Sequence, residues 1–152
     1  MLNDLAKRLR GKRVVILGIG NPLQGDDAIG PTLVDSLQGR VEAALINAGE
    51  VPENYISAVR AARPEVVLII AALELGTDAG CMAVMDADRL RAIENFTRNP
   101  GLAFLAVMIQ DETGAEVILV GVQPEATHFA AELSKPVYQS LRSLEEMLVG
   151  VY

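Results

Sequence analysis

Short runs of β-branched and apolar residues alternate along this chain with segments of helical periodicity. Five runs predict strands, at residues 13–17, 42–47, 65–71, 80–86 and 116–122. Apolar residues spaced three or four apart predict helices, at residues 3–10, 31–37, 52–62, 87–94, 102–110 and 132–149. This alternation favours a three-layer α/β/α domain, with a mostly parallel sheet of about five strands and helices on both faces.

Three details refine this expectation. The run at residues 65–71 is the most apolar of the five, so we expect it at the centre of the sheet. Segment 102–110 fits a strand or a helix, and its alanine, leucine and methionine content favours a helix. The 152 residues suit one domain, so we expect residues 1–152 to fold together, with residues 1–12 as a short helical extension.

Two residue types are scarce enough to limit the available chemistry. The chain has one cysteine, Cys81, and one histidine, His128. A disulfide framework, a CxxC zinc site and a histidine-rich metal cage are therefore excluded. Any nucleophilic pair with histidine would need His128, and we expect Cys81 to be a buried strand thiol. Carboxylates and backbone donors remain as the groups that could carry chemistry.

Charge and hydropathy exclude two classes of partner. The chain has 13 basic and 20 acidic residues, a net charge of −7, whereas nucleic-acid-binding modules carry a basic stripe. The longest apolar runs have eight residues, far short of a bilayer span. The basic start is not followed by the apolar region of a secretory signal. We expect a cytoplasmic protein without nucleic acid or membrane insertion.

The most informative segment is residues 18–31, GIGNPLQGDDAIGP, which leaves the first predicted strand. Such a glycine-rich turn is where α/β folds bind ligands. It is not a dinucleotide fingerprint, which needs glycine where Leu23 stands, and the P-loop lysine is absent. Its adjacent acids, Asp26 and Asp27, would repel a pyrophosphate. One of them could cap the following helix while the other faces a hard cation or a peptide N–H.

These motifs resemble one known family, the hydrogenase maturation proteases, nickel-dependent endopeptidases that trim the large-subunit precursor of [NiFe] hydrogenase. Residues 20–31 are similar to that family's GN-x-x-x-GDD-x-x-GP loop. Further similar motifs follow in order, at residues 52–54 (PEN), 63–64 (RP) and 121–124 (GVQP). The resemblance runs from about residue 13 to 148. It implies a phosphorylase/hydrolase-like fold, a large-subunit precursor or a paralogue of it as partner, and nickel that the substrate itself can supply.

The resemblance also assigns roles to residues of the glycine-rich loop. Asp27 corresponds to a catalytic carboxylate that is also a metal ligand. The remaining loop positions that shape the substrate site are Gly20, Asn21, Gly25 and Asp26.

The family's two other metal ligands fall on residues that cannot bind a metal. An aspartate at the end of the third strand corresponds to Ala71, and a histidine before a later helix corresponds to Arg98. Alanine has no donor atom, and arginine is a permanent cation. We expect the inherited nickel site to be lost, with Arg98 paired to Asp27 or Asp26. Glu74 and His128 are the residues that could rebuild a site with Asp27.

Three interpretations of function stay open. In the first, the chain is an active endopeptidase that keeps the family chemistry through substitute ligands. In the second, it is a catalytically inactive relative, a binding or chaperone-like module for a hydrogenase-like large subunit, and the two lost ligands favour this on chemical grounds. A nucleotide-binding or small-molecule-binding α/β protein is a weaker third interpretation, because the fingerprint spacing and the acids oppose it.

Overall fold

One five-stranded sheet organises the computed structural model, which describes residues 1–92, 100–125, 128–129 and 131–152. The strands are β1 (Val14–Ile19), β2 (Ala44–Gly49), β3 (Val66–Ala72), β4 (Met82–Asp86) and β5 (Glu116–Val122). Their order is β2-β1-β3-β5-β4, so the most apolar strand, β3, is central as predicted. All neighbours are parallel except β4, an edge strand that is antiparallel to β5.

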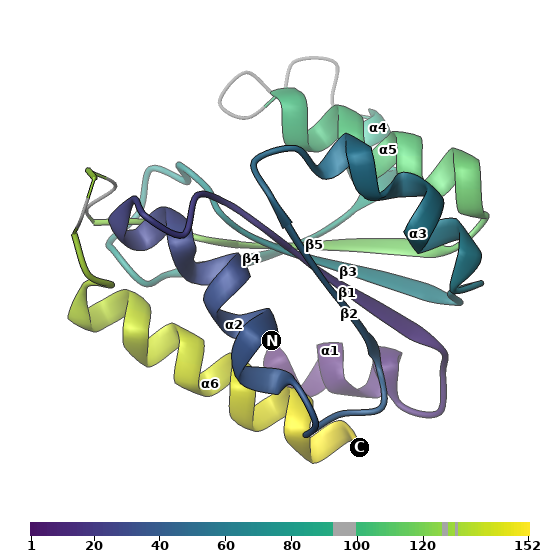
Figure 1. Cartoon of the computed structure of the whole chain (residues 1–152), viewed down its shortest axis with the longest axis horizontal. Coiled ribbons are helices and arrows are strands. Elements are labelled where there is room, and N and C mark those ends of the chain that lie inside the picture. The colour runs from purple at the N-terminus through teal and green to yellow at the C-terminus, as the bar shows by residue number, and fades with distance from the viewer. Residues whose placement is uncertain (93–99, 126–127, 130) are drawn as a thin grey trace.

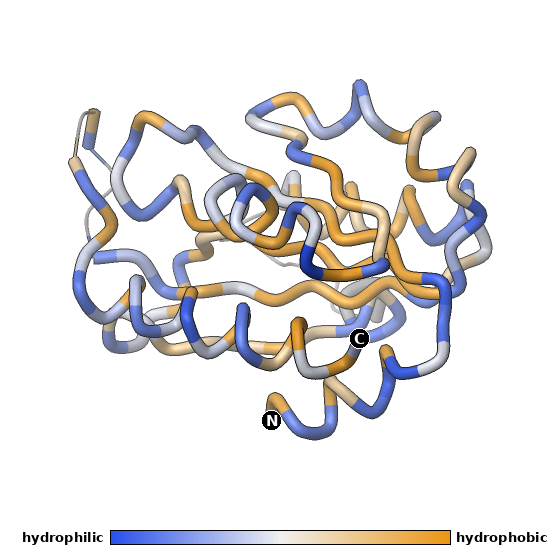
Figure 2. Tube along the Cα trace, turned by 60° about the horizontal axis from the view of Figure 1, so that its bottom comes forward, coloured by the Kyte–Doolittle hydropathy of each residue, from blue (hydrophilic) through white to orange (hydrophobic). Residues whose placement is uncertain are grey.

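Helices cover both faces of the sheet, which confirms the three-layer α/β/α prediction (Figure 1). One face carries α1 (Leu2–Leu9), α2 (Ile29–Leu37) and α6 (Lys135–Val151). The other carries α3 (Ile56–Ala61), α4 (Ala87–Ala92) and α5 (Pro100–Thr113). A buried apolar cluster fills each interface, and Figure 2 shows the hydrophobic strands between the helical layers. Among the described residues, none of the helices combines the length and the apolar character that a membrane span requires.

The ends of several elements differ from the sequence prediction. Residues 25–28 form a 3₁₀ turn, η1 (Gly25–Ala28), that leads directly into α2, and a second 3₁₀ turn, η2 (Pro52–Tyr55), precedes α3. Helix α6 begins three residues later than predicted, because Pro136 occupies its first turn, where proline is favoured. The prediction for Cys81 was wrong. Its N–H donates to the Asp78 carbonyl in a turn before β4, so the thiol is exposed.

Helix α1 is tied into the domain by packing and by charge. Leu5 and Leu9 are buried in the cluster beneath α6. Arg8 donates to the carboxylates of Asp86, at the end of β4, and Glu116, at the start of β5. The first helix therefore joins two neighbouring strands at the amino end of β5.

Glu145 is a buried acid that joins α6 to α2. Its carboxylate lies 3.3 Å from Nη1 of Arg40 and 3.1 Å from Nη1 of Arg142. A hydrogen bond from the Ser36 hydroxyl lowers the pKa of Glu145, burial opposes that change, and the two arginines add to the lowering. The charged carboxylate is therefore favoured in the folded state.

We expect Glu145→Gln to lower the free energy of unfolding by about 1 kcal/mol at neutral pH. Because folding lowers the pKa of Glu145, its contribution is complete above the unfolded-state pKa of about 4.3 and is lost as the pH falls through the lower folded-state pKa. Urea unfolding of wild type and variant across this acidic range measures the difference. A difference that stayed constant as the pH fell would contradict the prediction.

Candidate functional site

The parallel strands β2, β1, β3 and β5 all end at one edge of the sheet, termed here the carboxyl edge. Its loops are residues 20–28 after β1, 50–55 after β2, 73–81 after β3 and 123–134 after β5. In Figure 1 the loops after β1, β3 and β5 lie together at the left of the view. Ligand sites of α/β folds occur at this edge. The predicted site residues that the structure describes all lie in these loops or at the end of β3.

The loop after β1 is folded tightly around Asp27. The Asn21 N–H donates to Oδ2 of Asp27 at 2.7 Å, and Oδ1 of Asn21 accepts the Leu23 N–H at 2.8 Å. Gly20 has a φ of +146°, and a Cβ there would lie 1.8 Å from the Asp27 carbonyl oxygen, so only glycine fits. The loop thus fixes one carboxylate oxygen of the half-buried Asp27.

A second close approach brings this loop to the end of β3. A Cβ on Gly30, in the first turn of α2, would lie 2.5 Å from the Ile70 carbonyl oxygen and 2.6 Å from the Ile19 nitrogen. Glycine therefore lets α2 begin directly on the ends of β1 and β3. As a result, η1 with Asp27 contacts β3, the strand that carries Ala71.

Asp26 points toward the loop between β5 and α6 and is fully buried. Its Oδ1 accepts the Ser134 N–H, and its Oδ2 accepts the Ser134 hydroxyl and the Glu125 N–H, all at 2.7 Å. Neither acid caps η1 or α2 through its side chain, which corrects the capping interpretation. Asp26 instead ties the loop after β1 to the loop before α6.

The side chain of Gln123 forms hydrogen bonds with the loop after β3. The only indication of this role in the sequence is the GVQP motif. Its buried Oε1 accepts the N–H of Leu75 at 2.6 Å. Its Nε2 donates to Oε2 of Glu74 at 3.1 Å and to the Pro124 carbonyl at 3.2 Å. Gln123 therefore holds Glu74 against the end of β5.

The described residues do not assemble a resident metal site. Among them, no three His, Cys, Asp or Glu side chains lie close enough to hold a metal ion, which includes the combination of Asp27, Glu74 and His128. His128 is exposed, and Ala71 is buried among apolar side chains without a donor atom. Arg98 and its predicted pairing lie outside the described residues. The residues present do not fit the three-ligand set that the resemblance implied. Of the three positions in that set, only Asp27 carries a carboxylate.

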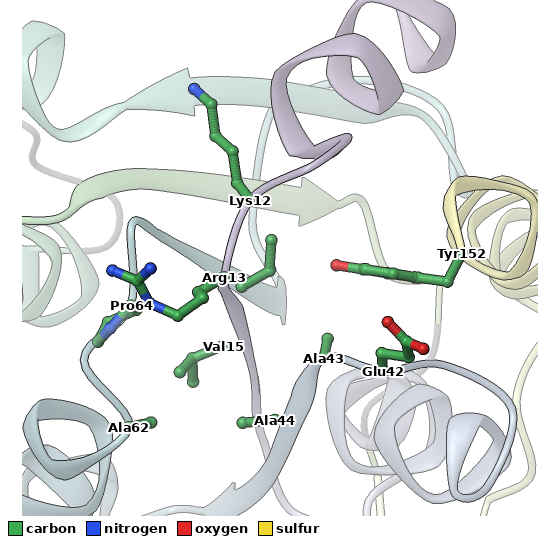
Figure 3. A pocket seen from close by; sticks show the side chains of 10 residues that line it. Lys12, Arg13, Val15, Glu42, Ala43, Ala44, Ala62, Pro64 and Tyr152 are labelled. Atoms are coloured by element: carbon green, nitrogen blue, oxygen red, sulfur yellow. The ribbon is translucent and has the colours of Figure 1, made fainter.

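A cavity of about 260 Å³ lies at the opposite edge, where β1 and β2 begin (Figure 3). The charged residues that line it are Lys12, Arg13 and Glu42, and the ring of Tyr152 lies beside them. Arg13 is already engaged, since its Nε donates to the Arg63 carbonyl at 3.0 Å. No predicted site residue lines this cavity, so the candidate site remains the carboxyl edge.

Comparison with known proteins shows one consistent similarity. The family model described as "Hydrogenase maturation protease" matches residues 29–151. The chain is 30% identical to the hydrogenase 3 maturation protease of Escherichia coli K12, over 90% of this chain and 88% of that protein. It is also 30% identical to a putative hydrogenase maturation protease of Methanocaldococcus jannaschii, over 99% and 90%. The crystal structure of the [NiFe] hydrogenase maturation protease HycI from Thermococcus kodakarensis superposes with a TM-score of 0.87, at 30% identity and over 97% of both chains.

Proposed function

Because the chain belongs to the hydrogenase maturation protease family, we propose that it recognises the large-subunit precursor of a [NiFe] hydrogenase and removes its C-terminal extension. The relatives are named as maturation proteases of hydrogenases, and the structural relative from Thermococcus kodakarensis is named as one for a [NiFe] hydrogenase. The observation that carries the proposal is the loop after β1, where Gly20 and Asn21 hold the Asp27 carboxylate at the carboxyl edge. The proposal places this reaction in the cytoplasm, where an exposed thiol such as that of Cys81 stays reduced.

We assign Asp27 as the residue that meets the substrate, with one of its carboxylate oxygens fixed by the Asn21 N–H. Gly20, Asn21 and Gly25 shape the loop, and Asp26 is a positioning residue that anchors it. In this proposal any nickel belongs to the substrate, since the described residues do not provide a ligand set of their own. No step therefore runs through a resident metal, and the chain's contribution is a single oriented carboxylate.

One observation favours a second candidate, the inactive binding module. The buried Ala71 stands where the resemblance places an aspartate ligand, and it supplies no donor atom. The similarity to named proteases favours the proteolytic role instead. Both candidates require recognition of the precursor at the carboxyl edge, and they differ in whether a peptide bond is cut.

Cleavage of a purified precursor separates the two candidates. We expect the chain to remove the extension from a nickel-loaded precursor, seen as a mass loss by intact-protein mass spectrometry. Asp27→Asn should abolish that mass loss, whereas Asp35→Asn, an exposed acid on α2, should leave it unchanged. Stable binding without cleavage would establish the inactive module, and absence of binding would overturn both candidates.

A further inference from the structure

Most of the large apolar side chains that the described residues leave exposed belong to segments that reach one edge of the molecule. The exposed side chains of this kind are Met1, Leu23, Val51, Phe104, Phe129, Tyr138 and Tyr152. Met1 and Tyr152 are the two ends of the chain. The other five belong to segments that reach the carboxyl edge, and we term them the apolar rim.

The topology places each member of the rim. Leu23, Val51 and Phe129 lie in the loops after β1, β2 and β5, and are 60%, 47% and 70% exposed. Phe104, 69% exposed, lies in the first half of α5, and Tyr138, 51% exposed, near the start of α6. Helix α5 leads into β5 and α6 follows it, so both helices begin at the carboxyl edge, as α6 shows in Figure 1. Because α5 and α6 cover opposite faces of the sheet, the rim extends from one face across the carboxyl edge to the other, and exposed apolar residues in such a region mark an interaction site.

Helix α5 adds a second observation. Residues 102–109 are apolar without interruption, and polar residues begin only at Gln110, toward the far end. A helix that is apolar all round is normally buried on all sides. Leu105, Ala106 and Ile109 are buried against the sheet, but Phe104 is exposed. Phe104 is thus the exposed apolar side chain in this half of α5, whereas Leu102, Ala103 and Met108 are partly buried against the same cluster as the sheet.

The charged side chains of the four loops have a single sign, whereas α6 carries the cations Lys135 and Arg142 close to Tyr138 in sequence. The four loops of the carboxyl edge contain no lysine or arginine. They carry six exposed acids, Glu50, Glu53, Glu74, Asp78, Glu125 and Glu132. A partner must therefore present apolar side chains flanked by basic residues. A second copy of this chain would oppose acids with acids, and a nucleic acid would oppose them with phosphates, so neither complements this edge.

Resting on the proposed function, we propose that the apolar rim and its six acids form the docking surface for the large-subunit precursor. The precursor would cover the rim with apolar side chains and bring lysine or arginine to the acids. The segment to be cut would then lie over Asp27. The rim thus supplies affinity, while Asp27 acts only on the segment that docking delivers.

Binding of the uncleaved precursor to the immobilised chain tests the rim. We expect the double variant Phe104→Ser with Phe129→Ser to bind at least tenfold more weakly, because a few large side chains that an interface buries carry most of its affinity. The matched control is Tyr152→Ser, an exposed aromatic outside the rim, which should bind within twofold of wild type. Thermal unfolding of each variant verifies that the fold is retained. Binding by the double variant at wild-type strength would overturn the docking surface alone, whereas a wild-type chain that fails to bind overturns the proposed function as well.

The acids of the docking surface are tested by the rate of association and its dependence on salt. The triple variant Glu50→Gln, Glu53→Gln, Glu125→Gln should slow association with the precursor and reduce its dependence on salt. Glu112→Gln, an exposed acid at the far end of α5, is the control and should change neither. Sedimentation of the free chain tests whether a second copy of this chain covers the rim instead of the precursor. A dimer that the Phe104→Ser, Phe129→Ser variant dissociates would assign the rim to a second copy and overturn the proposal.

Discussion

Replacement of Asp26 by asparagine is expected to lower the free energy of unfolding by about 3 kcal/mol, the largest loss of stability that we expect from a single substitution at this site. The carboxylate is 0% exposed and accepts hydrogen bonds from two backbone N–H groups and one hydroxyl. Those donors belong to Ser134 and Glu125, on a loop 99 to 108 residues away in sequence. The bonds therefore hold two distant loops of the carboxyl edge together.

An asparagine cannot satisfy these donors in either orientation. If its NH₂ group takes the place of Oδ1, it faces the Ser134 N–H, and if it takes the place of Oδ2, it faces the Glu125 N–H. In either case the asparagine NH₂ group faces a backbone N–H that has lost its acceptor. This lowers the free energy of unfolding by about 1–3 kcal/mol, in addition to the loss of the charge-assisted hydrogen bonds.

Urea unfolding followed by circular dichroism measures this loss. The matched control is Asp27→Asn, the same chemical change at the next residue. Asp27 is half-buried and accepts one backbone hydrogen bond from the described residues, so we expect a loss below about 1 kcal/mol there. Equal losses at the two positions would contradict the structural role of Asp26.

The architecture follows from local patterns in the sequence. Apolar runs alternating with amphipathic segments predict the three layers, because strands buried on both faces need helices on each side. The uninterrupted run of β3 predicts its central position. The turn at Asp78 was not visible in the pattern, and it leaves Cys81 outside β4 and exposed. Local periodicity fixes which segments form elements more reliably than where each begins.

At the site too, the features that depend on neighbouring residues could be predicted from the sequence, whereas those that depend on distant segments could not. The spacing of the glycine-rich loop predicts that Asp27 stands at the edge of the sheet, since Gly20 and Asn21 are its neighbours in sequence. The partners of Asp26 and Gln123 could not be predicted, because they come from segments joined only by the fold. The apolar rim was equally hidden, since periodicity indicates an apolar face without showing what covers it.

Restoration of the two substituted ligands is expected to turn the chain into a metal-binding protein. The wild-type chain should show no micromolar binding of Cd²⁺ or Ni²⁺, because its described residues contain no three-ligand cluster. The double variant Ala71→Asp with Arg98→His adds a carboxylate on the strand that η1 contacts, and replaces a permanent cation by an imidazole. With Asp27 this gives two carboxylates and a neutral nitrogen, a donor set suited to either ion.

The stability of the metal-free variant should reveal the same change. Ala71 is 2% exposed, so a carboxylate there is buried, and because its strand contacts η1 we expect it to repel the Asp27 carboxylate and destabilise the metal-free chain. Bound metal removes that repulsion, and at a metal concentration 100 times the Kd it stabilises the folded state by about 2.7 kcal/mol. The thermal midpoint of the double variant should therefore fall without metal and rise on addition of Cd²⁺, while that of the wild-type chain stays constant.

Calorimetric titration with Cd²⁺ decides between a lost site and a relocated one. Further substitution of Asp27→Asn in the double variant should abolish its binding, because the site then has one carboxylate and one imidazole. If the double variant does not bind, Ala71 and Arg98 do not occupy the positions that the resemblance assigns to them. If instead the wild-type chain binds at micromolar concentration and Asp27→Asn abolishes that binding, the chain builds a site from other residues. In that case other residues replace the two ligands lost at Ala71 and Arg98, and the loss of those ligands no longer favours an inactive module.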